Sequence, residues 1–301
     1  MKPPILFIFL LLLLINHDAD SQDRRIPIIG QLLSDLYQKH LFNGAIVIGQ
    51  KGKIIFNKGY GYANFQDSVL FNPFTCSDGG SNAKTLTAAA ILLLSEENKL
   101  SLNDSVQRYL PGYPYANTTV SNLITHSVGG LPDYDYFFEK TPDTATVTTS
   151  NNLDILNKQK PALNYSPGTN FYYDNVGFDL AALVIEKVSE KSYGQFLKER
   201  IFDPLGMDSS FVRPARFADW KPFRTIGYHY ENDSLKLFDI ADREGFYGGG
   251  NLWFNATDLY PTGYHQRGTG VRRLKPFCIS QQCNQGGRYK TRVYDWCEHD
   301  C

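Results

Sequence analysis

Apolar residues recur at helical spacing in several parts of the chain. Residues 27–40 carry apolar side chains three and four positions apart, which predicts an amphipathic helix. Residues 85–97 are rich in Ala and Leu and predict a buried helix, and residues 176–190 present one apolar helical face. Another helix is expected over residues 193–202, ended by Pro204, because proline cannot continue a helix from its interior.

Strand patterns are concentrated near the start of the chain. Two β-branched runs, residues 45–48 and 54–56, flank a Gly-containing turn and predict a β-hairpin. Residues 75–80 are polar and read as a turn rather than a strand. The expected order is one helix, an early hairpin and then several helices. Strands and helices do not alternate regularly, which favours the α+β class.

The N-terminal residues have the features of a signal peptide. Lys2 precedes an apolar run over residues 5–15, which is too short to span a bilayer comfortably. Small residues at positions 19 and 21 predict cleavage before Gln22, so residues 1–21 would be removed and the mature protein would be secreted or periplasmic. The alternative is an uncleaved membrane anchor.

The distribution of charged residues divides the chain after residue 21 into two parts. The whole chain has 30 basic and 31 acidic residues, a balance that argues against a nucleic-acid or anionic-membrane binder. Residues 22–258 have 22 Lys and Arg against 26 Asp and Glu, a net −4, and we expect them to form the functional domain. Residues 259–301 have 7 against 3, a net +4, and only 6 of these 43 residues are Leu, Ile, Val or Phe. We therefore expect a divergent, poorly ordered tail.

The cysteines follow the same division. Cys76 is alone in the body, and four cysteines lie in the tail, accompanied by His299: Cys278, Cys283, Cys297 and Cys301. They are compatible with a zinc site or with two disulfides in an exported protein. The tail cysteines lack the paired Cys-x-x-Cys spacing that would make either the zinc site or the disulfides convincing. A tail produced by a shifted reading frame or a misjudged gene end is the favoured interpretation.

A candidate nucleophile opens the helix over residues 85–97. Ser81 and Lys84 form a Ser-x-x-Lys element, and positions i and i+3 share one helix face. A serine hydroxyl needs a nearby base, and a lysine can serve if its surroundings favour the neutral amine. The alternative is a capping serine followed by an exposed helix lysine.

A second candidate element precedes the helix over residues 176–190. Tyr173 can relay a proton to a leaving group, and the amide of Asn175 can orient a substrate. Tyr-x-Asn occurs four times in the chain, so the element gains weight only from its context.

Four stretches supply that context in a fixed order: SNAKTLTAAAILLL from Ser81, LITHSVGGLPDY from Leu123, YYDNVGFDLAALVIEKVSEKSY from Tyr172 and GGGNLWFNATDL from Gly248. Together, over roughly residues 40–258, they resemble the serine beta-lactamase-related family of class C beta-lactamases, D,D-peptidases and esterases. The resemblance implies an antiparallel sheet flanked by helices, plus an all-helical lobe. It makes Ser81 the acylated nucleophile, Lys84 its proton acceptor, Tyr173 a general base or acid, and Asn175 a substrate-orienting residue. It implies no metal or organic cofactor.

The family pattern also differs from this chain. The turn at His126 is one residue longer, and we interpret His126 as a loop-setting residue rather than a base. The family's third motif, a strand with Lys-Thr-Gly or His-x-Gly, has no convincing counterpart, since residues 265–270 lack its spacing. We therefore expect the C-terminal strands to be missing.

Two functions follow from these observations. The first is an exported serine hydrolase that forms an acyl-enzyme on an amide, lactam or ester of a small molecule or peptide. The alternative is a catalytically impaired relative that binds penicillin or peptides.

Overall fold

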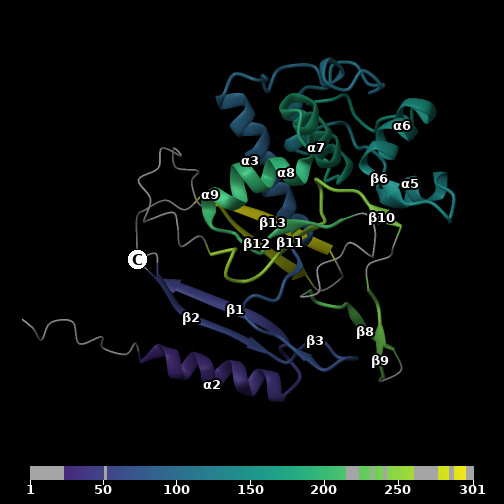
Figure 1. Ribbon diagram of the computed structural model, residues 1–301. Helices are drawn as coiled ribbons and strands as arrows, with labels where there is room; N and C mark the ends of the chain where they lie inside the picture. Colours follow the sequence, from purple (N-terminus) through teal and green to yellow (C-terminus); the bar gives the residue numbers. More distant parts are fainter. Residues whose placement is uncertain are drawn as a thin grey trace, which may run out of the picture.

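The computed structural model describes residues 24–50, 53–214, 224–231, 234–239 and 243–260, together with the backbone of residues 277–284 and 288–295. Most helices gather in one lobe, whereas the early hairpin and the first helix form a separate layer below it (Figure 1). The α+β class, with small antiparallel sheets and a helical lobe, is therefore confirmed. The expected signal peptide lies outside the described residues.

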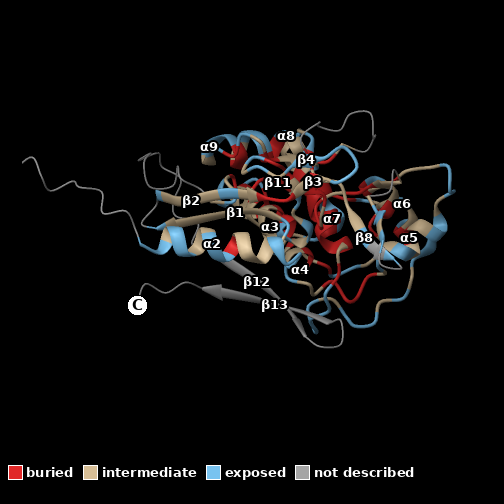
Figure 2. Ribbon diagram, turned by 90° about the horizontal axis from the view of Figure 1, so that it is seen from below, coloured by how far each residue is buried: buried red, intermediate tan, exposed pale blue. Residues whose placement is uncertain are grey.

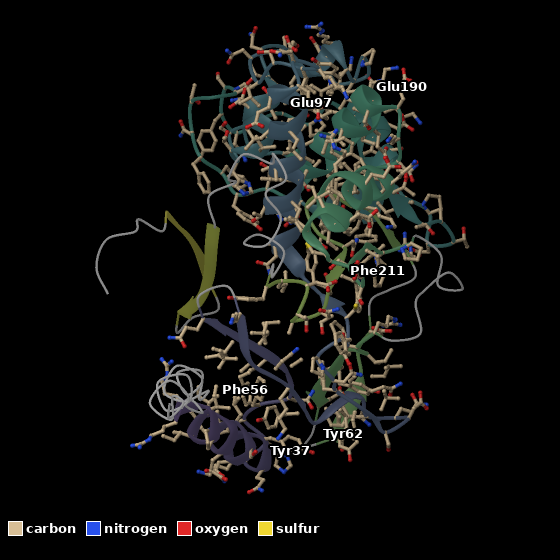
Figure 3. The ribbon with its side chains drawn as sticks, turned by 60° about the vertical axis from the view of Figure 1, so that its left-hand side comes forward. Tyr37, Phe56, Tyr62, Glu97, Glu190 and Phe211 are labelled. Atoms are coloured by element: carbon tan, nitrogen blue, oxygen red, sulfur yellow. The ribbon has the colours of Figure 1, made fainter. Side chains whose placement is uncertain are left out.

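The layer below the helical lobe is a helix packed on a hairpin. Helix α2 (Arg25–Gln38) covers strands β1 (Gly44–Gln50) and β2 (Lys53–Tyr60), which pair antiparallel with a bulge after Ile48. Phe56 of β2 and Tyr37 of α2 lie in the space between helix and hairpin (Figure 3). Both elements match the predicted helix and hairpin.

The helical lobe is centred on two long helices. Helices α3 (Ala83–Glu96) and α7 (Val176–Ser189) pack against each other, and the first ten residues of α7 are all buried. Figure 2 shows buried residues concentrated around α7, whereas α2 is mostly exposed or intermediate. Both predicted helices are confirmed. The smaller helices are η2 (Val106–Arg108), α4 (Val120–Ile124), α5 (Tyr134–Lys140) and α6 (Thr149–Gln159).

The expected stop at Pro204 is wrong. The helix continues from α8 (Tyr193–Leu197) through a π-helical segment (Lys198–Phe202) into α9 (Asp203–Leu205). It ends at Gly206, whose φ of 69° is the left-handed conformation that favours glycine. Pro204 is the second residue of α9 and directly follows the π-helical segment, so the helical conformation continues past the proline as far as Leu205.

A short buried sheet connects the start of α3 to the rest of the lobe. Strand β11 (Leu252–Phe254) pairs antiparallel with β5 (Ser77–Asp78) and with β7 (Phe211–Val212). The expected turn over residues 75–80 therefore contains a strand. All three residues of β11 are buried, so the central strand supplies the apolar side chains and β5 contributes mainly backbone hydrogen bonds.

The remaining strands are short and form separate pairs: β3 (Tyr62–Asn64) with β4 (Val69–Leu70), β10 (Glu244–Gly245) with β6 (Val147–Thr148), and β8 (Tyr228–Glu231) with β9 (Ser234–Leu237). No helix in the described part of the chain has the length and apolar character needed to cross a bilayer.

The described backbone of the tail forms a hairpin. Strands β12 (Phe277–Asn284) and β13 (Arg288–Asp295) pair antiparallel with each other, an arrangement that the low apolar content did not predict. Neither of them pairs with β1 or β2 in the described backbone. The boundary at residue 258 and the origin of the tail stay predictions, and the tail cysteines and residues 265–270 carry no described side chains.

Candidate active site

Ser81 lies in a tight turn that leads directly into α3. The turn η1 (Gly80–Asn82) is a single 3₁₀ segment, and α3 begins one residue later. Its entry is fixed by two hydrogen bonds, from Gly79 N–H to the Leu252 carbonyl (2.8 Å) and from Gly80 N–H to Asp78 Oδ1 (2.9 Å). The buried β5–β11 pair thus holds the nucleophile candidate in place.

Lys84 is buried directly beside Ser81. Its side chain is 6% exposed, and Nζ lies 3.2 Å from Ser81 Oγ, as expected for positions i and i+3 of a helix. Nζ also donates to Asn175 Oδ1 (2.7 Å) and to the Gly249 carbonyl (2.6 Å). The alternative of an exposed helix lysine is therefore wrong, because three oxygen atoms surround a buried amine.

Tyr173 completes the contacts of Ser81. Its hydroxyl lies 2.7 Å from Ser81 Oγ, and its ring lies 5.1 Å from Lys84 Nζ. The Tyr173 side chain is 42% exposed, so one side of the Ser81–Tyr173 pair is open to a substrate. The structure therefore brings the two predicted elements together from residues 92 positions apart.

His126 supports Tyr173 from behind. The His126 ring stacks on Tyr173 with a centroid distance of 4.4 Å, and Nδ1 accepts from the backbone N–H of Asp174 (3.3 Å). Burial, and secondarily the charge of Lys84, lower the pKa of His126 to about 4. His126 is therefore neutral near pH 7 and has no direct contact with Ser81 among its described bonds, which agrees with a loop-setting role.

Asn175 is engaged at both ends of its amide. Oδ1 accepts from Lys84, and Nδ2 donates to Asp133 Oδ1 (3.0 Å). Asp133 is the N-cap of α5 and thereby fixes which way the amide faces. Because Nδ2 carries two N–H groups, one remains to meet a substrate oxygen.

Several residues around Lys84 were not predicted from the sequence. The three glycines of residues 248–250, which we call the glycine strap, run past α3 and α7. Gly248 has a φ of 109°, and a Cβ there would lie 2.4 Å from the Phe178 carbonyl oxygen. The Gly-Gly-Gly run was the available signal, since such close backbone approach requires glycine.

Two buried carboxylates lie near the amine of Lys84. Burial raises the pKa of Asp174 to about 6 and that of Asp179 to about 7, and in each case Lys84 opposes the increase. Among the described residues, no group of His, Cys, Asp and Glu side chains is placed to hold a metal ion. The arrangement around Ser81 is therefore one of a hydroxyl, an amine, a phenol and an amide, which suits acyl transfer.

Comparison with known proteins agrees with this geometry. A family model described as Beta-lactamase matches residues 29–274, a wider range than the motifs alone indicated. The putative penicillin-binding protein PbpX of Bacillus subtilis (strain 168) is 32% identical over 232 residues, covering 76% of this chain and 56% of the relative. Protein flp of Staphylococcus aureus (strain N315) is 31% identical over 281 residues, covering 91% and 51%.

Solved structures show the same fold. A penicillin-binding protein from Bacillus halodurans superimposes with a TM-score of 0.66 at 26% identity, covering 76% of this chain and 70% of the other. An octameric penicillin-binding protein homologue from Pyrococcus abyssi gives 0.65 at 28%, covering 77% and 55%. The chain spans about half the length of the curated relatives it matches. On the family match and these relatives, the chain belongs to the beta-lactamase family of serine hydrolases.

Proposed function

We propose that this chain is a serine hydrolase that forms an acyl-enzyme on Ser81 with an amide, lactam or ester substrate. The observation that carries the proposal is the position of Ser81 Oγ, which lies 2.7 Å from the Tyr173 hydroxyl and 3.2 Å from Lys84 Nζ. A hydroxyl between an amine and a phenol has both a proton acceptor and a proton donor within reach.

The surroundings of Lys84 suit the first proton transfer. Asn175 Oδ1 and the Gly249 carbonyl accept two N–H groups, so a neutral amine would direct its lone pair at Ser81 Oγ. After taking the serine proton, the ammonium would donate its third N–H back to that oxygen. The same geometry therefore serves Lys84 before and after it accepts a proton.

Ser81 Oγ bonds to the substrate carbonyl carbon, and its proton moves to Lys84. The bond to the leaving nitrogen or oxygen breaks as Tyr173 gives that atom its hydroxyl proton, which the proton on Lys84 replaces. Water repeats the sequence in reverse to release the acid. Asn175 would orient the substrate through its remaining Nδ2 N–H.

Kinetics with a matched lysine control test this proposal. We expect Lys84→Ala to lower the acylation rate by about 10²–10⁴ with p-nitrophenyl acetate or a chromogenic cephalosporin. Lys99→Ala removes an exposed lysine that follows α3 and pairs with Glu97, and it should leave the rate unchanged. Equal rates in all three proteins would contradict the proposal. One acyl group bound without turnover would instead support the alternative, an impaired relative that binds penicillin or peptides.

Export is a separate part of the proposal. The support is the segment before α2, with Lys2, the apolar run over residues 5–15 and small residues before Gln22. Mass spectrometry of the protein recovered from a secreting host should give a mature N-terminus at Gln22. Recovery of only the full-length chain in the membrane fraction would contradict cleavage and favour an anchor.

A further inference from the structure

We propose that Asp179 is a positioning residue, whose carboxylate fixes the glycine strap so that the Gly249 carbonyl faces Lys84. The inference rests on the proposed function, because it assigns Asp179 a role in orienting the proton acceptor of Ser81. Asp179 itself touches neither Ser81 nor Lys84 through any described hydrogen bond, and it would act entirely through the strap.

One peptide unit of the strap is held at both of its ends. The Gly248 carbonyl accepts from Thr87 Oγ1 of α3 at 2.7 Å, and the N–H of the same peptide, on Gly249, donates to Asp179 Oδ1 of α7 at 2.9 Å. Two side chains from the two central helices therefore set the plane of this peptide. The next carbonyl, that of Gly249, accepts from Lys84 at 2.6 Å. Rotation of the held peptide would carry this acceptor away from the amine.

The strap has little freedom to compensate. A Cβ on Gly249 would lie 2.7 Å from the Asn175 carbonyl oxygen and 3.2 Å from Asp179 Oδ1, so the backbone runs directly along the start of α7. Among the described hydrogen bonds, the Gly249 N–H has the Asp179 carboxylate as its acceptor, and Asp179→Ala would remove that acceptor. The position of the Gly249 N–H therefore depends on Asp179.

The carboxylate of Asp179 is itself held by several donors. It is completely buried, and it accepts from the Tyr134 hydroxyl and from Asn152 Nδ2, each at 3.2 Å, in addition to Gly249. All three partners donate, which suits an ionised carboxylate. Burying a carboxylate costs free energy that an apolar residue at this position would avoid. A role in positioning the Gly249 carbonyl toward Lys84 would account for a buried carboxylate at position 179.

The chain offers a matched control on the same helix. Glu186 of α7 also accepts one backbone N–H, from Tyr193 (2.7 Å), and one tyrosine hydroxyl, from Tyr247 (2.9 Å). It has the same kinds of partner as Asp179 but does not bond to the glycine strap. Glu186→Ala therefore removes a carboxylate with the same kinds of partner and leaves the bond between the Gly249 N–H and Asp179 in place, although its partner Tyr247 directly precedes the strap.

The experiment measures single-turnover acylation by p-nitrophenyl acetate. We expect Asp179→Ala to lower the acylation rate constant about 10- to 100-fold with KM changed less than about threefold, because a small misplacement of a catalytic group has effects of this size. Asp179→Asn keeps an acceptor for the Gly249 N–H and should restore most of the rate. Glu186→Ala should retain the parent rate. An equal loss in Asp179→Ala and Glu186→Ala, or no loss in the former, would overturn the proposal.

A second readout separates this inference from the proposed function. Hydrogen exchange of the peptide that contains Gly249 should accelerate in Asp179→Ala but not in Glu186→Ala, and amine labelling of Lys84 should become faster. If the parent protein is not acylated, the proposed function fails, while this exchange pattern still tests whether Asp179 holds the strap. Unchanged exchange at Gly249 would refute the positioning role in either case.

Discussion

Replacing Asp179 with asparagine should make the protein more stable at high pH than the parent. In the folded protein, burial raises the pKa of Asp179 from 3.8 to about 7, so the folded state binds a proton more readily than the unfolded chain does. The contribution of Asp179 to stability is therefore fully present below pH 3.8 and is lost as the pH rises through about 7. The asparagine side chain of the variant cannot ionise and avoids this loss.

The size of the effect follows from that difference. A separation of about three pH units corresponds to up to about 4 kcal/mol, at 1.36 kcal/mol for each unit. The carboxylate is 0% exposed, so solvent screening does not reduce the figure. The hydrogen bonds can survive in the variant, because Asn152 can reverse its amide and offer Oδ1, which is buried without a partner among the described residues, to the new side-chain NH₂.

Urea unfolding of both proteins between pH 4 and pH 8, followed by tryptophan fluorescence, measures the difference. The free energy of unfolding of Asp179→Asn minus that of the parent should increase with pH, mostly between pH 4 and 7. Asp154→Asn removes an exposed carboxylate of α6 and should stay within about 0.5 kcal/mol of the parent throughout. A difference for Asp179→Asn that stays flat, or that falls with pH, would refute the reasoning.

Three further changes test other parts of the structure. Thr87→Val removes a buried hydroxyl that donates to the Gly248 carbonyl, and it should lower the free energy of unfolding by about 1–3 kcal/mol in denaturant titrations. Gly248→Ala forces a Cβ to 2.4 Å from a backbone oxygen at a φ of 109° and should cost more than about 1 kcal/mol, whereas Gly250→Ala meets nothing within 4 Å and should cost less. The pKa of His126 is lowered from 6.5 to about 4, so its contribution to stability is present above pH 6.5 and is lost as the pH falls toward 4. His126→Gln should therefore weaken the decrease in the free energy of unfolding on the acid side. An unchanged dependence of that free energy on pH would contradict the lowered pKa of His126.

The long elements could be predicted because their signals are local. Helices α3 and α7 have continuous apolar patterns, and the β1–β2 hairpin has two β-branched runs around a turn. The stop at Pro204 was misplaced because the chain keeps a helical conformation through the proline, and the left-handed Gly206 ends the helix instead. Strand β5 was missed because two polar residues carry no period, and its pairing depends on the buried strand β11.

Part of the site could be predicted because its residues also have local sequence signals. Ser81, Lys84, Tyr173 and Asn175 belong to motifs with fixed spacing, so the sequence could name them. The roles of Gly249 and Asp179 depend on how residues 248–250 pass between two helices, which no local pattern encodes. Asp179 in particular lies on a helix face that the apolar period alone would assign to the core.

The most direct test of the account is the identification of the acylated residue. Purified protein is incubated with a fluorophosphonate or with penicillin G, digested, and analysed by peptide mass spectrometry. We expect one adduct, on Ser81, that disappears in Ser81→Ala and forms more slowly in Lys84→Ala. An adduct on another residue, or labelling that persists unchanged in Ser81→Ala, would contradict the claim that Ser81 is the nucleophile.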